Sequence, residues 1–242
     1  MTPGGRGLFI VFEGVEGAGK TTQLRRLAHR LESAGVPVWA VREPGGSPVG
    51  EAIRSLVLDP DLGPTPEAEL LLMLAARAEF VRRVVRPALE AGQVVLADRY
   101  ELSTLAYQGL ARGLGLERVR ELNAWATGGL RADATLLLTV DPSEGVRRRE
   151  GTRPDRMERE GGAFHESVAR AYRRLAEEEP GVLQVAGDGS PEEVEGRVWS
   201  ALAGRWPRRF PPAGGRGTET LGLGPGVKGK TGSGTSDPAE DA

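Results

Sequence analysis

The sequence predicts an α/β fold in which a parallel five-stranded sheet is doubly wound, with helices on both faces. Five short apolar runs alternate with longer stretches whose apolar residues recur at helical spacing. The runs are almost continuously apolar, which is typical of strands that are buried on both faces of a sheet. A glycine-rich segment, GVEGAGKT at residues 14–21, lies between the first run and the first helical stretch. Because parallel strands need crossover connections, this alternation indicates consecutive βαβ units.

Apolar runs and helical spacing place each element along the chain. The strands are predicted at residues 8–13, 36–41, 94–98, 134–140 and 182–187. The first helix carries Leu24, Leu27 and Leu31 on one face and ends before Gly35, a residue type that commonly caps helices. The helices are predicted at residues 20–34, 49–58, 65–90, 103–112, 117–126, 143–149, 164–179 and 191–202.

Capping and breaking residues support the later helices. The stretch at residues 65–90 opens with Pro66 in an acidic first turn, which is favourable at a helix N-terminus. Gly92 closes this helix, and Pro87 predicts a kink or an earlier end. Ser190 is the expected N-cap of the last helix.

Composition narrows the class of protein. The 242 residues suit one domain with an appendage, and the net charge of −2 gives no indication of a nucleic-acid or membrane surface. Cysteine is absent, which excludes disulfides, thiolate metal sites and a cysteine nucleophile, and which fits a cytoplasmic protein. No apolar run approaches the roughly 20 residues of a membrane span. We therefore expect no nucleic-acid partner and no membrane partner.

The C-terminal stretch differs from the rest of the chain. Residues 211–242 include nine Gly and four Pro but no aromatic residue. Such a segment buries too little apolar surface to offset the entropy of ordering it, so we expect disorder. The predicted organisation is one domain at residues 1–210, followed by a disordered tail at residues 211–242.

The glycine-rich segment has the pattern G-x-x-x-x-G-K-T between a strand and a helix, which is the context of a P-loop. Glycines let successive backbone N–H groups point at one phosphate, and the positive helix end faces the same anion. Lys20 is one of three lysines among 32 Lys and Arg residues, and its compact ammonium suits the β- and γ-phosphates better than a planar guanidinium does. The fold is therefore expected to be of the P-loop NTPase type. The expected nucleotide-binding residues are Gly14, Val15, Glu16, Gly17, Ala18, Gly19, Lys20, Thr21 and Thr22.

A second motif specifies the class of P-loop protein. The segment DRYELSTLAYQ, residues 98–108, follows the third predicted strand. Four other segments accompany it: EGVEGAGKTT, REPGG at residues 42–46, AAR at residues 75–77 and RRREGTRPDR at residues 147–156. Together these five segments resemble the bacterial thymidylate kinases (dTMP kinases) of the P-loop nucleoside monophosphate kinase family. The resemblance covers about residues 7–205. It implies phosphorylation of dTMP to dTDP with ATP and Mg²⁺, a step of dTTP synthesis for DNA replication, and it implies a homodimer.

Three residues at predicted strand ends suit the acceptor phosphate and the metal. Asp98 ends the third strand, where its carboxylate can orient Mg²⁺ together with the Thr21 hydroxyl. The resemblance assigns the dTMP phosphate to Arg42 and Arg99, and two guanidiniums form a good clamp for a dianion. Helix capping is the alternative role for Asp98, and a surface ion pair is the alternative for either arginine. The predicted metal-binding residues are Thr21 and Asp98.

The resemblance also assigns the remainder of dTMP. Glu16 would contact the 3′-hydroxyl, and Arg77 and Thr104 would hydrogen-bond the edges of thymine. Tyr107 would pack under the deoxyribose and reject ribonucleotides, although a place in the core is an alternative for this ring. Met73 stands where family members usually carry a Phe stacked on thymine, which leaves the preference for thymine over uracil open. The predicted substrate-binding residues are Glu16, Arg42, Met73, Arg77, Arg99, Ser103, Thr104, Tyr107 and Gln108.

An arginine-rich segment at about residues 147–158 is predicted to be a mobile lid. It follows the fourth strand and the next helix, where related kinases place a lid, and a solvated charge run is the alternative. Since the P-loop holds no arginine, the resemblance implies that the lid supplies the arginine that neutralises the transferring phosphoryl group. We expect Arg149 and Arg153 in that role, with Arg148 as the alternate. The predicted catalytic residues are Lys20, Arg99, Arg149 and Arg153.

Two other functions compete with this interpretation. One is a kinase for another nucleotide or for a deoxynucleoside, although Arg42 and Arg99 favour an acceptor that already carries a phosphate. The other is a nucleotide-gated switch or a DNA-associated ATPase, which predicts hydrolysis without an acceptor and a basic surface. The net charge of −2 argues against such a surface.

Overall fold

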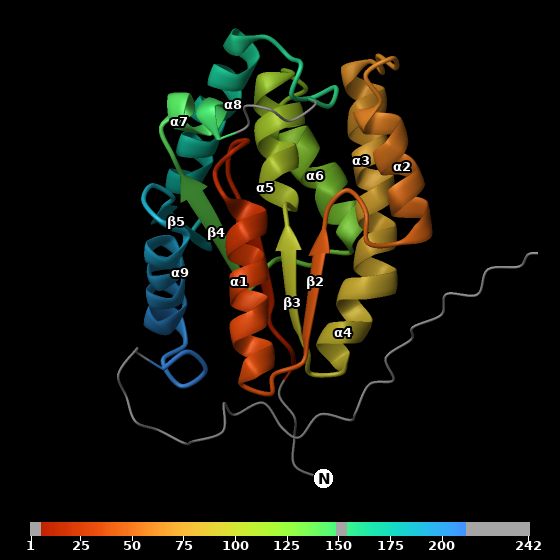
Figure 1. Ribbon diagram of the computed structural model, residues 1–242. Coiled ribbons are helices and arrows are strands. Elements are labelled where there is room, and N and C mark those ends of the chain that lie inside the picture. The colour runs from red at the N-terminus through yellow and green to blue at the C-terminus, as the bar shows by residue number, and fades with distance from the viewer. Residues whose placement is uncertain (1–5, 149–153, 212–242) are drawn as a thin grey trace, which may run out of the picture.

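The five predicted strands form one parallel sheet in the order β2-β3-β1-β4-β5 (Figure 1). The computed structural model describes residues 6–148 and 154–211, and every pairing of neighbouring strands within them is parallel. The strands are β1 (Phe9–Glu13), β2 (Val38–Arg42), β3 (Val94–Asp98), β4 (Ala134–Thr139) and β5 (Val182–Ala186). The predicted α/β fold with a doubly wound parallel sheet is confirmed.

Helices cover both faces of this sheet (Figure 1). Helices α1 and α9 pack on one face and contact each other, whereas α4 and α8 contact β3 and β5 from the opposite face. The α-helices are α1 (Lys20–Ser33), α2 (Pro48–Leu58), α3 (Pro66–Phe80), α4 (Arg86–Glu90), α5 (Glu101–Thr104), α6 (Leu116–Thr127), α7 (Pro142–Arg147), α8 (Gly162–Glu178) and α9 (Pro191–Arg205). Two π-helical segments are η1 (Val81–Val85) and η2 (Leu105–Ala111).

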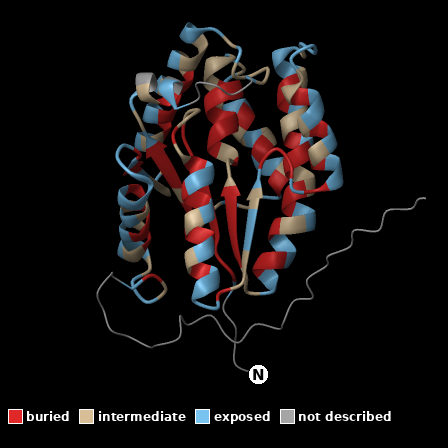
Figure 2. Cartoon of the chain, in the orientation of Figure 1, coloured by how far each residue is buried: buried red, intermediate tan, exposed pale blue. Residues whose placement is uncertain are grey.

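The core lies on both sides of the central strands. Ile10 and Phe12 pack towards α1 and α9, while Phe9 and Val11 pack towards η1 and α4, and all four side chains are fully buried. This alternation follows from the two-residue period of a strand. The edge strand β2 is half exposed, unlike the continuously buried strand that its apolar sequence predicts, because it has a neighbour on one side only (Figure 2).

Two predicted helices contain π-helical turns instead of being regular throughout. The helix predicted at residues 65–90 is divided by η1, which ends just before Pro87. Proline lacks the N–H that would bond to the carbonyl of Arg83, and its ring clashes with that carbonyl, so a wider turn relieves the conflict. The helix predicted at residues 103–112 becomes α5 followed by η2.

The sheet places the polar strand ends beside one another. In the parallel register Asp98 lies next to Phe12 of β1 on one side and next to Arg42 of β2 on the other. Glu13 ends β1 one residue later. Ligands of open α/β sheets bind at this carboxyl edge, so the fold gathers the predicted site residues where a ligand is expected.

Some sequence predictions concern segments outside the described residues. Arg149 and Arg153 of the predicted lid belong to this group, as do residues 212–242 of the predicted tail. Among the helices that the structure describes, none is both long enough and apolar enough to cross a bilayer.

Candidate active site

The P-loop connects β1 to α1, and close backbone contacts require glycine at two of its positions, Gly14 and Gly17. Gly17 has a φ of 76°, and a Cβ there would lie 2.2 Å from the carbonyl oxygen of Gly145. Lys20 is the first residue of α1, and its Nζ donates a hydrogen bond to the carbonyl of Val15 at 2.8 Å. Burial and the neighbouring Arg99 lower the pKa of Lys20. The negative charge of a bound phosphate would therefore stabilise the charged form of this ammonium.

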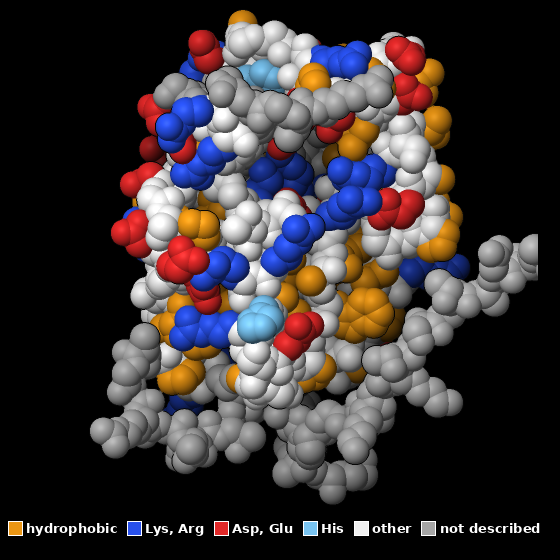
Figure 3. All heavy atoms as spheres, in the orientation of Figure 1, with side chains coloured by type: hydrophobic (Ala, Val, Ile, Leu, Met, Phe, Trp, Pro, Cys, Tyr) orange, Lys and Arg blue, Asp and Glu red, His pale blue; other side chains and the backbone are white. Residues whose placement is uncertain are grey.

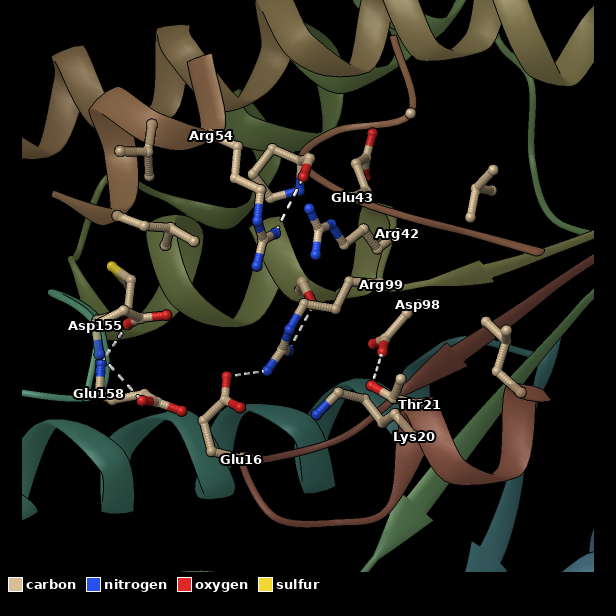
Figure 4. A pocket seen from close by; sticks show the side chains of 18 of the residues that line it. Glu16, Lys20, Thr21, Arg42, Glu43, Arg54, Asp98, Arg99, Asp155 and Glu158 are labelled. Carbon is tan, nitrogen blue, oxygen red and sulfur yellow. Dashed lines mark hydrogen bonds and ion pairs between the residues drawn. The ribbon is translucent and has the colours of Figure 1, made fainter. Parts of the chain in front are cut away.

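Thr21 and Asp98 meet beside this loop. The Thr21 hydroxyl donates a hydrogen bond to Oδ2 of Asp98, so α1 and β3 bring the two predicted Mg²⁺ ligands together (Figure 4). The helix-cap alternative for Asp98 does not hold, because the N-cap of α5 is Tyr100. No group of three or more acidic, histidine or cysteine side chains suited to a metal occurs in the described part of the chain. A Mg²⁺ ion bound here would take most of its oxygen ligands from nucleotide phosphates and water.

A cavity of about 820 Å³ opens at the carboxyl edge of the sheet. Figure 3 shows basic side chains gathered around a recess on this face. The predicted site residues that line the cavity are Glu16, Gly17, Gly19, Lys20, Thr21, Thr22, Arg42, Met73, Asp98, Arg99, Ser103, Tyr107 and Gln108. Arg77 and Thr104 do not line it and are completely buried. The structure thus brings most of the predicted acceptor and nucleotide residues to one cavity.

Three arginines point into this cavity opposite the P-loop (Figure 4). Arg42 ends β2 and Arg99 follows β3, as predicted, and Arg54 of α2 joins them. Arg54 donates to the carbonyl of Pro44 at 3.1 Å, while Arg42 forms an exposed ion pair with Glu51 at 3.1 Å. Burial and the charge of Arg42 lower the pKa of Arg54. An anion between the three guanidiniums would offset this repulsion.

The sequence reasoning did not single out Arg54. No motif surrounds it, and the chain holds many arginines of similar appearance. Its helix packs against α3, which turns one side of α2 towards the cavity, and this arrangement could not be read from periodicity alone.

Arg99 is the most highly connected of the three arginines. Its φ of 75° is unusual for a residue with a Cβ. Its Nη1 donates to the Gly14 carbonyl at 3.2 Å, to Ser103 Oγ at 3.0 Å and to the Tyr172 hydroxyl at 3.0 Å, and its Nη2 pairs with the carboxylate of Glu16. Its guanidinium is therefore held at a defined place between the P-loop and α8.

Glu13 anchors the backbone that carries Arg99. This carboxylate is completely buried and accepts hydrogen bonds from the backbone N–H groups of Tyr100 and Ser103 at 2.8 and 3.1 Å. It also accepts from Ser103 Oγ at 2.6 Å and from the Tyr172 hydroxyl at 2.9 Å. The sequence reasoning missed Glu13 and Tyr172. A charged residue at the end of an otherwise apolar strand was the available signal for Glu13.

Arg77 serves the protein itself in this structure. Its Nη2 lies 2.7 Å from Oε2 of Glu43, and both side chains are buried. The same guanidinium donates to Asn123 Oδ1 at 2.6 Å and to the Tyr100 carbonyl at 2.8 Å. In this structure the guanidinium donates to protein acceptors and does not line the cavity, and no described feature tests the predicted contact between Arg77 and thymine. That contact stays a prediction.

Tyr107 and Gln108 lie on η2 at the cavity wall. The Tyr107 ring packs edge-on against Phe164 and Tyr172, and burial raises the pKa of Tyr107 to about 12. The two alternatives for this ring are thus compatible, because it belongs to the core and also lines the cavity. Within the described residues, Oε1 of Gln108 and Oγ1 of Thr104 are buried without a hydrogen-bond partner.

The described part of the arginine-rich segment is held by specific contacts. Arg148 donates to Glu144 at 2.8 Å and to the Gly187 carbonyl at 3.0 Å, and it lines the cavity. Arg156 donates to the Val57 carbonyl at 2.7 Å. The solvated charge run, which was the alternative for this segment, does not describe these two residues. Arg149 and Arg153 lie outside the described residues.

Comparison with known proteins gives a consistent result. A family model described as Thymidylate kinase matches residues 12–198. The thymidylate kinase of Deinococcus radiodurans is 49% identical over 203 residues, which cover 83% of this chain and 98% of that protein. The thymidylate kinase of Syntrophotalea carbinolica is 48% identical over 200 residues, covering 79% and 93%. That of Symbiobacterium thermophilum is 44% identical over 211 residues, covering 86% and 99%.

Proposed function

The chain belongs to the thymidylate kinase family, and we propose from this membership how the two sides of the cavity share the reaction. The chain phosphorylates dTMP to dTDP with ATP as the phosphoryl donor. One observation carries the assignment of sides: Lys20 and the P-loop face Arg42, Arg54 and Arg99 across a single cavity. The P-loop side takes the triphosphate of ATP, and the arginine side takes the phosphate of dTMP.

This arrangement suits an in-line transfer between two anions. The acceptor oxygen belongs to a phosphate that is already ionised at neutral pH, so no general base is needed to activate it. The chain's contribution is to hold both phosphates close together and to neutralise their charge. Lys20 and Arg99 are near enough for each to affect the electrostatics of the other, as the lowered pKa of Lys20 indicates. We assign both residues to the transferring phosphoryl group.

A magnesium ion fits beside the P-loop. Thr21 and Asp98 supply hard oxygen donors that are already hydrogen-bonded to each other. When bound, Mg²⁺ supplies charge neutralisation on the phosphates of ATP. Asp98 orients the Thr21 hydroxyl, and its place in the register beside Arg42 keeps the carboxylate close to the acceptor side.

We also propose roles for the segments around this site. The arginine-rich segment at about residues 147–158 acts as the lid, and Arg149 and Arg153 reach the transferring phosphoryl group. Residues 1–210 form the catalytic domain, and residues 211–242 follow it as a tail. The enzyme works in the cytoplasm, supplies dTDP for dTTP synthesis, and takes no nucleic-acid or membrane partner.

We further propose a homodimer. Leu71 of α3 and Trp125 of α6 are strongly exposed, and the helices that carry them contact each other. Large exposed apolar side chains on adjoining helices favour a protein interface. The second copy of this chain would bury both residues.

An acceptor panel tests the function. Purified full-length chain is incubated with ATP and Mg²⁺ plus dTMP, dUMP, dCMP or no acceptor, and ADP release is followed in a coupled assay. We expect rapid release with dTMP and background release without an acceptor. Acceptor-independent release would favour a nucleotide-gated switch, and faster release with dCMP than with dTMP would favour a kinase for another nucleotide.

A further inference from the structure

Glu69 is a buried carboxylate that none of the roles above uses. It lies on α3 and its side chain is only 1% exposed. Its Oε1 accepts a hydrogen bond from Nε2 of Gln108 at 2.8 Å. Its Oε2 accepts from Nη2 of Arg156 at 2.6 Å and from Nη2 of Arg112 at 3.2 Å. One carboxylate thus joins the cavity wall to two arginines behind it.

The surroundings keep this carboxylate ionised. Burial alone would raise the pKa of Glu69, but hydrogen bonds from Gln108, Arg156 and Arg112 outweigh burial and lower it. An ionised carboxylate has no proton to donate and accepts hydrogen bonds only. Its partner on the Gln108 side chain must therefore be the amide N–H₂ group and not the amide oxygen.

This constraint determines how the Gln108 amide faces. When Nε2 points at Glu69, the other branch of the planar amide, Oε1, points away from it. Gln108 lines the cavity, and its Oε1 is buried with no hydrogen-bond partner in the part of the chain that the structure describes. An unpaired buried acceptor costs about 1–3 kcal/mol. A ligand that brings a donor to this wall would relieve that cost.

We propose that Glu69 is a positioning residue that makes the cavity select pyrimidine bases with an N–H at N3. It does so by holding Gln108 so that only an acceptor oxygen is offered to the base. The inference rests on the proposed dTMP kinase function, and it concerns how the base of the acceptor nucleotide is selected.

The chemistry of the bases gives this orientation a consequence. Thymine and uracil both carry a hydrogen at N3, which the fixed Oε1 of Gln108 can accept. Cytosine has a lone pair at N3, so the same oxygen would face another acceptor without a proton between them. A site built to hydrogen-bond one group rejects an analogue that leaves its buried polar atoms unpaired. The methyl group that separates thymine from uracil is not read by this contact.

The test is the Glu69→Gln substitution in the full-length chain. A neutral amide at residue 69 can donate as well as accept, so Gln108 is released to turn either way. We expect the ratio of kcat/KM for dTMP to that for dCMP to fall about tenfold, mainly through a higher KM for dTMP. The ratio for dTMP to dUMP and the KM for ATP should be unchanged, because neither depends on N3 discrimination.

Glu160→Gln is the matched control. Glu160 pairs with the same Arg112 as Glu69 does, and no hydrogen bond between Glu160 and Gln108 occurs among the described residues. This variant should keep the wild-type ratio of dTMP to dCMP. If both variants changed that ratio equally, the effect would come from the arginine cluster and the proposal would be wrong.

Gln108→Leu tests the same proposal if the Glu69→Gln variant does not fold. Gln108→Leu removes the amide while keeping much of its bulk, and it should lower the ratio of dTMP to dCMP by a similar factor. In a Gln108→Leu background, Glu69→Gln should have no further effect on the ratio, because it acts through that amide. An unchanged ratio in Gln108→Leu, or additive effects in the double variant, would overturn the proposal. Wild-type turnover of dTMP separately tests the proposed function.

Discussion

Nη2 of Arg77 lies 2.7 Å from Oε2 of Glu43, and each side chain is only 1% exposed. This buried ion pair joins α3 to Glu43, which directly follows Arg42 at the end of β2. Burial raises the pKa of Glu43 and the positive charge of Arg77 opposes that change, so the carboxylate depends on its partner. Glu43 lines the substrate cavity and Arg77 does not, so Arg77 supports the cavity by holding Glu43 in place.

Replacing Arg77 should damage stability before it affects substrate selection. Arg77→Met leaves the Glu43 carboxylate buried and unpaired, which should lower the free energy of unfolding by about 3–5 kcal/mol. Chemical denaturation measures this loss, which should be smaller in mildly acidic buffer, where Glu43 can take up a proton. The double variant Arg77→Met/Glu43→Gln should lose less than the sum of the single variants. If Arg77→Met kept the wild-type free energy of unfolding but lost the preference for dTMP over dCMP, Arg77 would instead be a residue that contacts the base.

Arg54 should affect the binding of dTMP but not the binding of ATP. Arg54→Ala removes one of three guanidiniums that face the cavity, so the KM for dTMP should rise about tenfold while the KM for ATP stays nearly constant. Steady-state kinetics with each substrate varied in turn measures both constants. Arg86→Ala is the matched control, since Arg86 also donates to backbone carbonyls, those of Thr127 and Gly128, but lies outside the cavity lining. Equal changes in both constants for Arg54→Ala would contradict its assignment to dTMP.

Asp98 should control the response to magnesium. Asp98→Asn preserves an acceptor for the Thr21 hydroxyl but removes the charge, so activity should fall by about 10–100-fold and more Mg²⁺ should be needed for half-maximal rate. Titration of activity with Mg²⁺ at saturating ATP tests this expectation. Asp133→Asn is the control, because Asp133 accepts a hydrogen bond from the backbone N–H of Phe9, the first residue of β1, at the end of the strand opposite to the site. An unchanged Mg²⁺ requirement in Asp98→Asn would exclude the metal role.

The buried ammonium of Lys20 predicts how stability depends on pH. Burial lowers the pKa of Lys20 in the folded chain below the ordinary value of 10.5. Between these two values the unfolded chain binds a proton that the folded chain does not, so the free energy of unfolding should increase as pH rises. For one full proton the slope is about 1.4 kcal/mol per pH unit. The difference between wild type and Lys20→Met, measured by denaturation across the alkaline range, should show this rise. A flat difference would mean that the pKa of Lys20 is not lowered.

The sequence predicted those parts of the site that depend on local pattern. The five strands and the P-loop follow from apolar runs and from glycine spacing, and the structure places Lys20, Arg42, Asp98 and Arg99 around one cavity. Strand ends are informative because parallel register brings them to one edge whatever the loops do.

Tertiary contacts account for what was missed. The η2 turn that carries Gln108 follows α5 directly, and it packs against α3, α6 and α8, which lie far from it in the sequence or come later. The AAR motif predicted a base contact for Arg77, yet the position of its side chain depends on Glu43, which lies 34 residues away in sequence. Glu13 and Tyr172 meet at Ser103 from opposite ends of the domain. No periodicity in a single sequence specifies such partners.

The most direct test of the two-sided cavity is a crystal structure with one bisubstrate molecule, in which five phosphates join adenosine to thymidine. We expect the phosphate chain to run from the amides around Lys20 to the guanidiniums of Arg42, Arg54 and Arg99, with thymine N3 within hydrogen-bond distance of Gln108. A thymidine group located away from these arginines, or a phosphate chain that bypasses the P-loop, would contradict the account.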